Sequence, residues 1–279
     1  MIRPAKVNDA EAIPRIPLGA CLCFKDSAAY IEEWLLFHYV QGIRRFYLYD
    51  NESSDDWGSI VAPWIKDGLV TATRYPGKGV QAEIYDHCLQ RARGEVDWLA
   101  FIDDDEFLFP TGPESLPDLL ADYAAYAGLA VSWVLLGSGG AERSSPEWVI
   151  RRFTGAAGGP DSHVKCIVQP GRVVRSRVIG HSFEPSPGFQ IVDENKHPLS
   201  EPQNPAPSAA RVRINHYLIK SWEEWRFRRS RPQANTGAPT PLPESNWREW
   251  DRQWSGVPDA SALRFLGPME ELKKQRAYR

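Results

Sequence analysis

The chain has 279 residues, of which 42% are hydrophobic and 11% aromatic, so it can bury a sizeable core. A net charge of −3 excludes a general electrostatic attraction to nucleic acid or to anionic lipid. The uncharged stretch 123–141 is interrupted by Gly128 and Ser132, so it predicts a helix end, a turn and a buried strand and no transmembrane segment. Four cysteines and no recognisable signal peptide predict a reducing compartment. We therefore expect a cytoplasmic protein, free or peripheral to the inner face of the membrane.

Strand and helix patterns alternate along the first 102 residues. Apolar runs predict strands at 17–24, 44–49, 69–75 and 98–102, and apolar residues at helical spacing predict helices between them. This alternation is typical of a parallel sheet covered by helices. Ligands of such sheets bind beyond the carboxyl ends of the strands. Polar clusters fall at those ends, namely Lys25-Asp26, Asp50-Asn51 and Asp103-Asp104-Asp105.

The second half of the chain has shorter strand patterns, separated by turns rich in glycine and proline. They lie at 131–136, 164–168, 173–179 and 212–214, with proline-rich connectors at 198–207 and 231–243. We therefore expect one α/β domain over 1–279. Its nucleotide-binding half would span 17–110, a mixed α+β acceptor-side half 111–230, and a C-terminal loop and helices 231–279.

Four consecutive carboxylates, Asp103-Asp104-Asp105-Glu106, follow a buried strand pattern. Clustered carboxylates repel one another, so a site that keeps them ionised needs a cation. Oxygen ligands favour Mg²⁺ or Mn²⁺, which makes Asp103 and Asp105 the predicted metal ligands of an Asp-x-Asp motif. Asp103 and Asp104 are also candidates for contact with a ribose. The alternatives are a solvated acidic turn and a phosphatase or phosphotransferase with Asp103 as nucleophile, which the following Glu106 and the three preceding strands disfavour.

An ordered set of motifs resembles the family 92 glycosyltransferases, relatives of the inverting family 2 enzymes. The matching stretches are Lys25-Asp26, 30–34, 49–51, 98–107, 137–140, 165–170, and 215–217 with Lys220-Ser221. The resemblance implies a GT-A fold with a Rossmann-like, mostly parallel sheet. It also implies a nucleotide-sugar donor (often a UDP-sugar), Mn²⁺ or Mg²⁺, and inversion at the anomeric carbon. The acceptor would be a hydroxyl of a glycan or glycoconjugate, as in polysaccharide biosynthesis. The arginine-rich segment after Ser221 departs from the family pattern and leaves the acceptor open.

The resemblance also suggests a role for a late histidine. Enzymes of this type often add such a histidine to the Asp-x-Asp ligands, and His216, at the end of an alternating run, is the best match. Imidazole is a more natural ligand for Mn²⁺ than for Mg²⁺. The alternatives are a histidine bonded to a backbone carbonyl and His181 as the ligand instead.

Donor contacts are predicted for polar residues at strand ends, at a helix start and after Ser221. For three of them a structural role is the alternative: an Asx-turn at Asp50, a helix cap at Asp26 and a plain helix start at Gln81. Together with Asp103 and Asp104, the predicted donor-binding residues are Lys25, Asp26, Asp50, Asn51, Gln81, Lys220, Arg226 and Arg229.

Inversion needs a base that takes the proton of the acceptor hydroxyl. Glu142, Asp161, His163 and His181 are all plausible, and Glu142 and His181 rank first. The run 137–140, Gly-Ser-Gly-Gly, lacks the lysine of a phosphate-binding Walker loop, so we interpret it as a turn through which backbone approaches the sugar or the acceptor. A non-catalytic module that binds nucleotide or carbohydrate is the remaining alternative.

Overall fold

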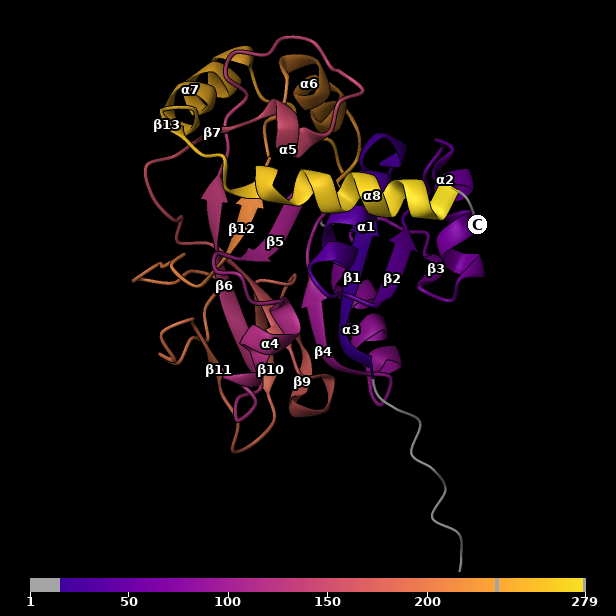
Figure 1. The fold of residues 1–279 in the computed structure, drawn as a ribbon, viewed down its shortest axis with the longest axis vertical. Coiled ribbons are helices and arrows are strands. Elements are labelled where there is room, and N and C mark those ends of the chain that lie inside the picture. The colour runs from indigo at the N-terminus through magenta and orange to yellow at the C-terminus, as the bar shows by residue number, and fades with distance from the viewer. Residues whose placement is uncertain (1–15, 234–235, 278–279) are drawn as a thin grey trace, which may run out of the picture.

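A mixed sheet of nine strands runs through the protein (Figure 1). The structure is a computed structural model that describes residues 16–233 and 236–277. The main path of the sheet follows the order β3-β2-β1-β4-β8-β6-β12-β5, and β11 pairs with β6. The sheet therefore joins both halves of the chain.

The first four strands of this path are parallel and alternate with helices. They are β1 (Ile16–Phe24), β2 (Arg45–Asp50), β3 (Val70–Arg74) and β4 (Val96–Phe101), and the helices are α1 (Ala28–Val40), α2 (Trp57–Lys66) and α3 (Gln81–Ala92). Each predicted strand and helix of this half is present. The predicted α/β fold of GT-A type, with a Rossmann-like first half, is confirmed.

The second half adds strands of both directions. These are β5 (Glu106–Pro110), β6 (Gly128–Leu135), β8 (Val164–Val168), β11 (Ile191–Val192) and β12 (Val212–His216). β8 runs antiparallel between β4 and β6, while β12 runs parallel to β6 and antiparallel to β5. Two small sheets, β9 (Val173–Val178) with β10 (Ser182–Pro185) and β7 (Gly155–Ala156) with β13 (Val257–Pro258), complete the mixed half.

Two buried clusters cover the two faces of the sheet, and the alternation along β1 separates them. Leu18, Ala20 and Leu22 pack into the cluster that includes α1 and α2, whereas Cys21 and Cys23 pack into the cluster that includes α3. This is the period of two expected for a strand buried on both faces. All four cysteines of the chain are free and buried.

Short helices and the C-terminal helices complete the fold. They are α4 (Leu116–Ala121), α5 (Val149–Arg152), α6 (Trp222–Ser230), α7 (Glu244–Trp254) and α8 (Leu266–Ala277). α8 lies along α1 (Figure 1), where Lys273 and Glu32 form an ion pair at 2.6 Å. The buried carboxylate of Glu33 accepts the first two backbone N–H groups of α5, at 2.8 and 3.0 Å, and so caps that helix from α1.

The Gly-Ser-Gly-Gly run at 137–140 packs against the end of α7. A Cβ at Gly137 would lie 2.0 Å from Ser255 Oγ, and the backbone N–H groups of Ser138 and Gly140 donate to the Asp251 carboxylate. The small residues of this turn therefore have a structural role, because they allow its close approach to α7.

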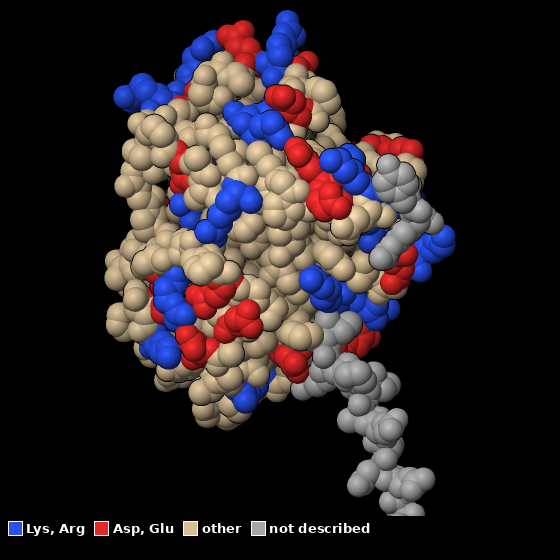
Figure 2. Space-filling model, in the orientation of Figure 1, with Lys and Arg blue, Asp and Glu red and all other residues tan. Residues whose placement is uncertain are grey.

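Acidic and basic side chains are interspersed over the face shown in Figure 2. Among the described residues, no helix is both long enough and apolar enough to cross a bilayer.

Candidate active site

One edge of the sheet collects the carboxyl ends of β1, β4, β6 and β12 and the amino ends of β5 and β8. This follows from the strand directions, since β8 opposes β4 and β6, and β5 opposes β12. The turn 103–105, which joins β4 to β5, lies at this edge. Because the two halves of the sheet share the edge, residues far apart in the sequence meet there.

Asp103 is held by partners on both carboxylate oxygens. Oδ2 accepts from Lys165 Nζ at 2.8 Å, while Oδ1 accepts from Tyr85 Oη at 3.2 Å and from Gln81 Nε2 at 3.4 Å. Lys165 also lies 3.6 Å from the buried Glu106 carboxylate, which accepts the Asp103 N–H at 2.7 Å. Burial would raise the pKa of Asp103, but Lys165 outweighs it and brings that pKa to about 2. The side chain is thus an ionised, oriented carboxylate, and neither oxygen is free as the phosphatase alternative would require.

Asp105 and His216 are adjacent because β12 pairs with β5, where His216 lies opposite Glu106. Asp105 is fully buried, and neither of its carboxylate oxygens accepts a hydrogen bond. His216 Nε2 lies 3.5 Å from Asp105 Oδ2, and His216 Nδ1 has no partner. The guanidinium of Arg228 contacts the same Asp105 oxygen. This guanidinium balances the charge of the buried carboxylate, so a metal ion at Asp105 would compete with Arg228.

These two residues fit a divalent cation better than the three that the sequence predicts. Among the described residues, no three of the histidine, cysteine, aspartate and glutamate side chains are grouped to hold a metal ion. Both Asp103 oxygens accept hydrogen bonds, whereas Asp105 Oδ1 and His216 Nδ1 have no hydrogen-bond partner and Asp105 Oδ2 contacts Arg228. Burial lowers the pKa of His216 to about 4, so its imidazole is neutral and able to ligate near pH 7. Mn²⁺ and Mg²⁺ accept few protein ligands when phosphate oxygens and water supply the rest.

A pocket opens beside this cluster between the β1 end, the acidic turn and α6. It is lined by Cys23, Phe24, Lys25, Gln81, Asp103, Asp104, Arg228, Arg231, Pro232 and Gln233. Asp104 accepts a hydrogen bond from the buried Ser27 hydroxyl. Of the predicted donor-binding residues, Lys25, Gln81, Asp103 and Asp104 line this pocket.

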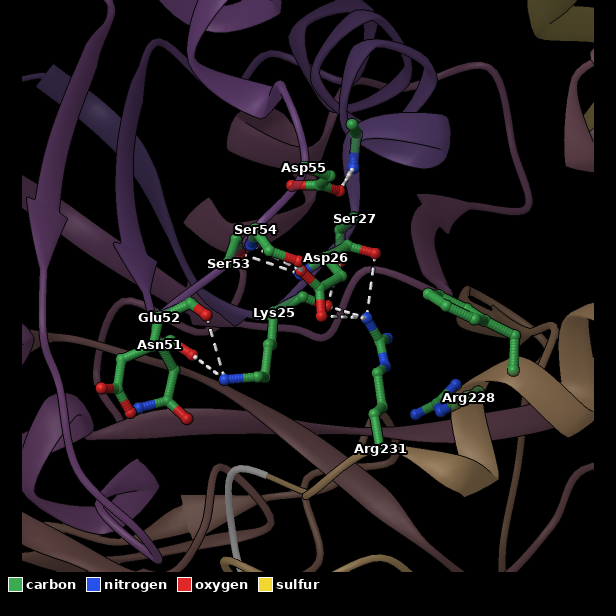
Figure 3. Close-up of polar contacts among 12 residues, drawn as sticks. Lys25, Asp26, Ser27, Asn51, Glu52, Ser53, Ser54, Asp55, Arg228 and Arg231 are labelled. Carbon is green, nitrogen blue, oxygen red and sulfur yellow. Dashed lines mark hydrogen bonds and ion pairs between the residues drawn. The ribbon is translucent and has the colours of Figure 1, made fainter.

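The loop after β1 is joined to α6 by one arginine, as Figure 3 shows. The Arg231 guanidinium donates to the backbone carbonyls of Lys25 and Asp26. Lys25 Nζ donates to the carbonyls of Asn51 and Glu52, each at 3.0 Å, and the Asp26 carboxylate accepts the Ser54 N–H at 2.7 Å. Asp26 therefore holds the neighbouring loop and is not the N-cap of α1, which is Ser27.

Asp50 and Asn51 hold loops and do not line the pocket. Asp50 Oδ1 accepts the Ser53 N–H at 2.7 Å, the turn contact expected of the alternative. Asn51 Nδ2 donates to the carbonyls of Tyr75 and Gly77, at 2.9 and 3.0 Å. Both side chains are buried, because they close the connections at the ends of β2 and β3.

The arginines of α6 divide between two sides of the helix. Arg228 and Arg231 line the pocket, whereas Arg229 stacks on Trp225, 4.2 Å from the ring centre, and Arg226 lies over Trp222 at 5.8 Å. The pocket is therefore lined by Arg228 and Arg231, and not by the predicted Arg226 and Arg229.

Lys220 is buried, and it lines a small cavity together with Asp104. Its ammonium lies 4.4 Å from the centre of the Tyr30 ring, and burial lowers its pKa despite the nearby Asp104 carboxylate. Lys220 thus adds a positive charge behind the pocket and does not line it directly.

The two first-ranked base candidates lie in different surroundings. Glu142 is 67% exposed, 3.9 Å from Arg248, and does not line the pocket. His181 Nδ1 donates to the Val164 carbonyl at 2.6 Å, and burial lowers the pKa of this imidazole to about 3. Its ring contacts Trp133, which also contacts His216. His181 is therefore near the site, and Glu142 is not.

Comparisons with known proteins agree with this architecture. The family model described as glycosyltransferase family 92 matches residues 17–203. A family 92 protein from Ricinus communis is 28% identical over 92% of this chain and 49% of its own length, and one from Oryza sativa subsp. japonica is 28% identical over 73% and 33%. The chain thus spans half or less of the length of these relatives. A solved structure, glucosyl-3-phosphoglycerate synthase from Mycobacterium tuberculosis with Mn²⁺, UDP and phosphoglyceric acid, has a TM-score of 0.29 and 21% identity over 42% of this chain and 43% of that one.

Proposed function

The chain belongs to glycosyltransferase family 92, and from this premise we propose that it transfers a sugar from a UDP-sugar to a hydroxyl of a glycan or glycoconjugate, with inversion at the anomeric carbon. The donor diphosphate would lie over the Asp105–His216 pair, within reach of Arg228 and Arg231. The nucleoside would extend toward the end of β1.

One observation carries the proposal, namely the state of Asp105. This carboxylate has no exposed surface and no hydrogen bond to either oxygen, and its neighbours are His216 and a guanidinium. A buried carboxylate is strongly disfavoured unless a cation balances its charge, and among the protein groups the Arg228 guanidinium supplies that charge. A phosphate-bound divalent cation would satisfy Asp105 and His216 together.

The other residues of the pocket have separable roles. Asp103, ionised and oriented by Lys165, can accept hydrogen bonds from ribose hydroxyls. Arg228 and Arg231 present planar guanidinium groups that suit phosphate oxygens. When bound, Mn²⁺ or Mg²⁺ acts as a Lewis acid that neutralises charge on the departing diphosphate. Arg231 also ties α6 to the β1 loop, so it fixes the two walls of the pocket relative to each other.

The first test measures UDP binding and its dependence on Mn²⁺ by isothermal titration calorimetry. Asp105→Asn should weaken Mn²⁺-dependent UDP binding at least about 100-fold, because a direct ligand matters at least as much as an outer-shell partner. Asp122→Asn, a substitution of a 54% exposed carboxylate, is the matched control and should bind like wild type. Unchanged UDP and Mn²⁺ binding by Asp105→Asn would refute the metal assignment.

The second test measures UDP release from UDP-glucose, UDP-galactose and UDP-N-acetylglucosamine with Mn²⁺, using water as acceptor. Proton NMR of the first product formed reports stereochemistry, since inversion of an α-linked donor yields the β-anomer. Tight UDP binding without release from any donor would instead favour the non-catalytic binding module.

A further inference from the structure

We propose that His163, positioned by Asp161, is the base that accepts the proton of the acceptor hydroxyl in the transfer reaction. This inference rests on the proposed function and assigns a residue to its one unfilled role. The two residues precede β8, at the same edge of the sheet as the acidic turn.

The geometry of the pair is that of an oriented imidazole. His163 Nδ1 lies 2.6 Å from Asp161 Oδ1, and the same oxygen accepts the His163 backbone N–H at 2.8 Å. Backbone hydrogen bonds tie the segment to β6, from Asp161 N to Trp133 O at 2.7 Å and from Trp133 N to His163 O at 3.0 Å. The His163 ring stacks on Trp133, with centroids 5.2 Å apart and planes at 21°. Ring and carboxylate are therefore held against β6 by backbone hydrogen bonds and by the Trp133 ring.

These contacts also decide which nitrogen can accept a proton. With the carboxylate of Asp161 as acceptor, Nδ1 carries the hydrogen, so Nε2 carries the lone pair. The Gln203 side-chain amide nitrogen donates to Nε2 at 3.3 Å, so an acceptor hydroxyl would take the place of this long hydrogen bond. The His163 side chain is 43% exposed, so an acceptor hydroxyl can reach it.

Trp133 connects this pair to the proposed diphosphate site. One side of the indole stacks on His163, and the ring centre lies 4.2 Å from that of His216, which is itself 3.5 Å from Asp105. A sugar placed against the Asp105–His216 pair would thus lie beside Trp133, whose ring also contacts His163.

His163 is better suited to the role than His181. A proton on His181 would create a buried cation close to the ammonium of Lys165, which already disfavours the charged form. A proton on His163 would instead lie on an imidazole paired with a carboxylate. The ionised partner stabilises the imidazolium that forms, as in other histidine–carboxylate pairs.

The proposed step balances as a displacement. The acceptor oxygen attacks the anomeric carbon while its proton moves to His163 Nε2, and the bond from that carbon to the diphosphate oxygen breaks. UDP leaves with the bonding electron pair, and His163 later returns its proton to solvent. Asp161 stays ionised throughout.

The test compares two nucleophiles with the UDP-sugar that wild type hydrolyses fastest. Water carries a proton that must be removed, whereas azide is an anion with none, and glycosyl azide is quantified by mass spectrometry. His163→Ala should lower kcat for hydrolysis about 10²–10⁴-fold, the usual contribution of a general base. The same variant should retain azide transfer and Mn²⁺-dependent UDP binding within about threefold. Asp161→Asn should lower kcat for hydrolysis less than His163→Ala does and leave the donor KM and azide transfer unchanged.

His197→Ala is the matched control, since His197 is 72% exposed and also faces an aspartate, Asp193, at 3.4 Å; it should behave like wild type. Three results would overturn the assignment: hydrolysis by His163→Ala within threefold of wild type, equal losses with water and azide, or loss of UDP binding. Loss of hydrolysis in His181→Ala with azide transfer retained, and not in His163→Ala, would move the role to His181. If wild type itself released no UDP from any donor, the proposed function would fail, and this inference with it.

Discussion

Removal of the buried Lys165 ammonium tests how the acidic edge of the sheet is held together. Lys165→Met keeps a long unbranched side chain but leaves Asp103, formerly 2.8 Å away, and the buried Glu106, formerly 3.6 Å away, without their cation. Breaking a buried ion pair from one side costs about 3–5 kcal/mol. We expect the free energy of unfolding at pH 7.5 to fall by about that amount, as measured by urea denaturation.

The pH dependence provides the sharper test of the same substitution. In wild type the pKa of Asp103 is lowered to about 2, against an ordinary 3.8, so its stabilising contribution is present above pH 3.8 and is lost as the pH falls through 2. Without Lys165, burial should raise that pKa above its unfolded value. The folded variant then binds more protons than its unfolded chain does. The difference in the free energy of unfolding between wild type and variant should therefore shrink as the pH falls from 7.5 to 4.

Two further variants make the result decisive. Lys273→Met removes an exposed ion pair with Glu32, whose side chains are 48% and 41% exposed, and should cost no more than about 1 kcal/mol at either pH. Adding Glu106→Gln to Lys165→Met should recover part of the loss, because one of the two unpaired carboxylates is then neutral. A deficit below about 1 kcal/mol, or one that is the same at pH 4 and pH 7.5, would refute the reasoning.

Three other predictions test separate parts of the structure. Burial raises the pKa of Glu33 to about 7, so the free energy of unfolding of wild type should fall by up to about 3 kcal/mol between pH 4.5 and 8. If the urea midpoint of Glu33→Gln changed with pH as that of wild type does, the raised pKa of Glu33 would be contradicted. Gly137→Ala should lower the free energy of unfolding by several kcal/mol, since its Cβ would lie 2.0 Å from Ser255 Oγ. Gly139→Ala, whose Cβ would have nothing within 4 Å, should cost about 1 kcal/mol because of the positive φ of this residue. Equal decreases of Tm in the two variants would exclude the close contact at Gly137. Arg228→Met removes the guanidinium that contacts the Asp105 carboxylate, so Mn²⁺ alone should raise the Tm of this variant more than that of wild type. An equal rise of Tm would show that Mn²⁺ and the Arg228 guanidinium do not compete for Asp105.

The parallel half of the fold was predictable because its signals are local. Each strand of 17–102 is a short apolar or alternating segment bounded by polar residues, and the helices repeat apolar positions at helical spacing. The acidic turn was located for the same reason, since Asp103 and Asp105 directly follow a strand. The motif resemblance supplied His216, which the pattern of its own strand could not have distinguished from a packed histidine.

The arginines of α6 show where local pattern is insufficient. The capping box from Ser221 to Glu224 fixes where the helix starts, and the buried Trp225 marks its inner side. Arg228 and Arg229 follow that tryptophan by three and four residues, and both spacings place a side chain on the same side of a helix as the tryptophan. Which of these two arginines faces the pocket depends on how α6 is oriented against the loop after β1. No local sequence pattern predicts that orientation.

Strand direction explains why the sequence did not predict the role of Lys165 and did not rank His163 first among the candidate bases. The rule that ligands lie beyond the carboxyl ends of strands directs attention to residues that follow a strand, such as Asp105 and His216. β8 runs against β4 and β6, so it presents its first residues to the same edge, and Lys165 and His163 lie at or before the start of that strand. Lys165 meets Asp103 only because β8 is inserted between β4 and β6, a pairing across some 60 residues that no spacing reveals. In a mixed sheet, therefore, the residues that begin the antiparallel strands belong in the search as much as those that end the parallel ones, and here they supply both the cation that orients Asp103 and the proposed base.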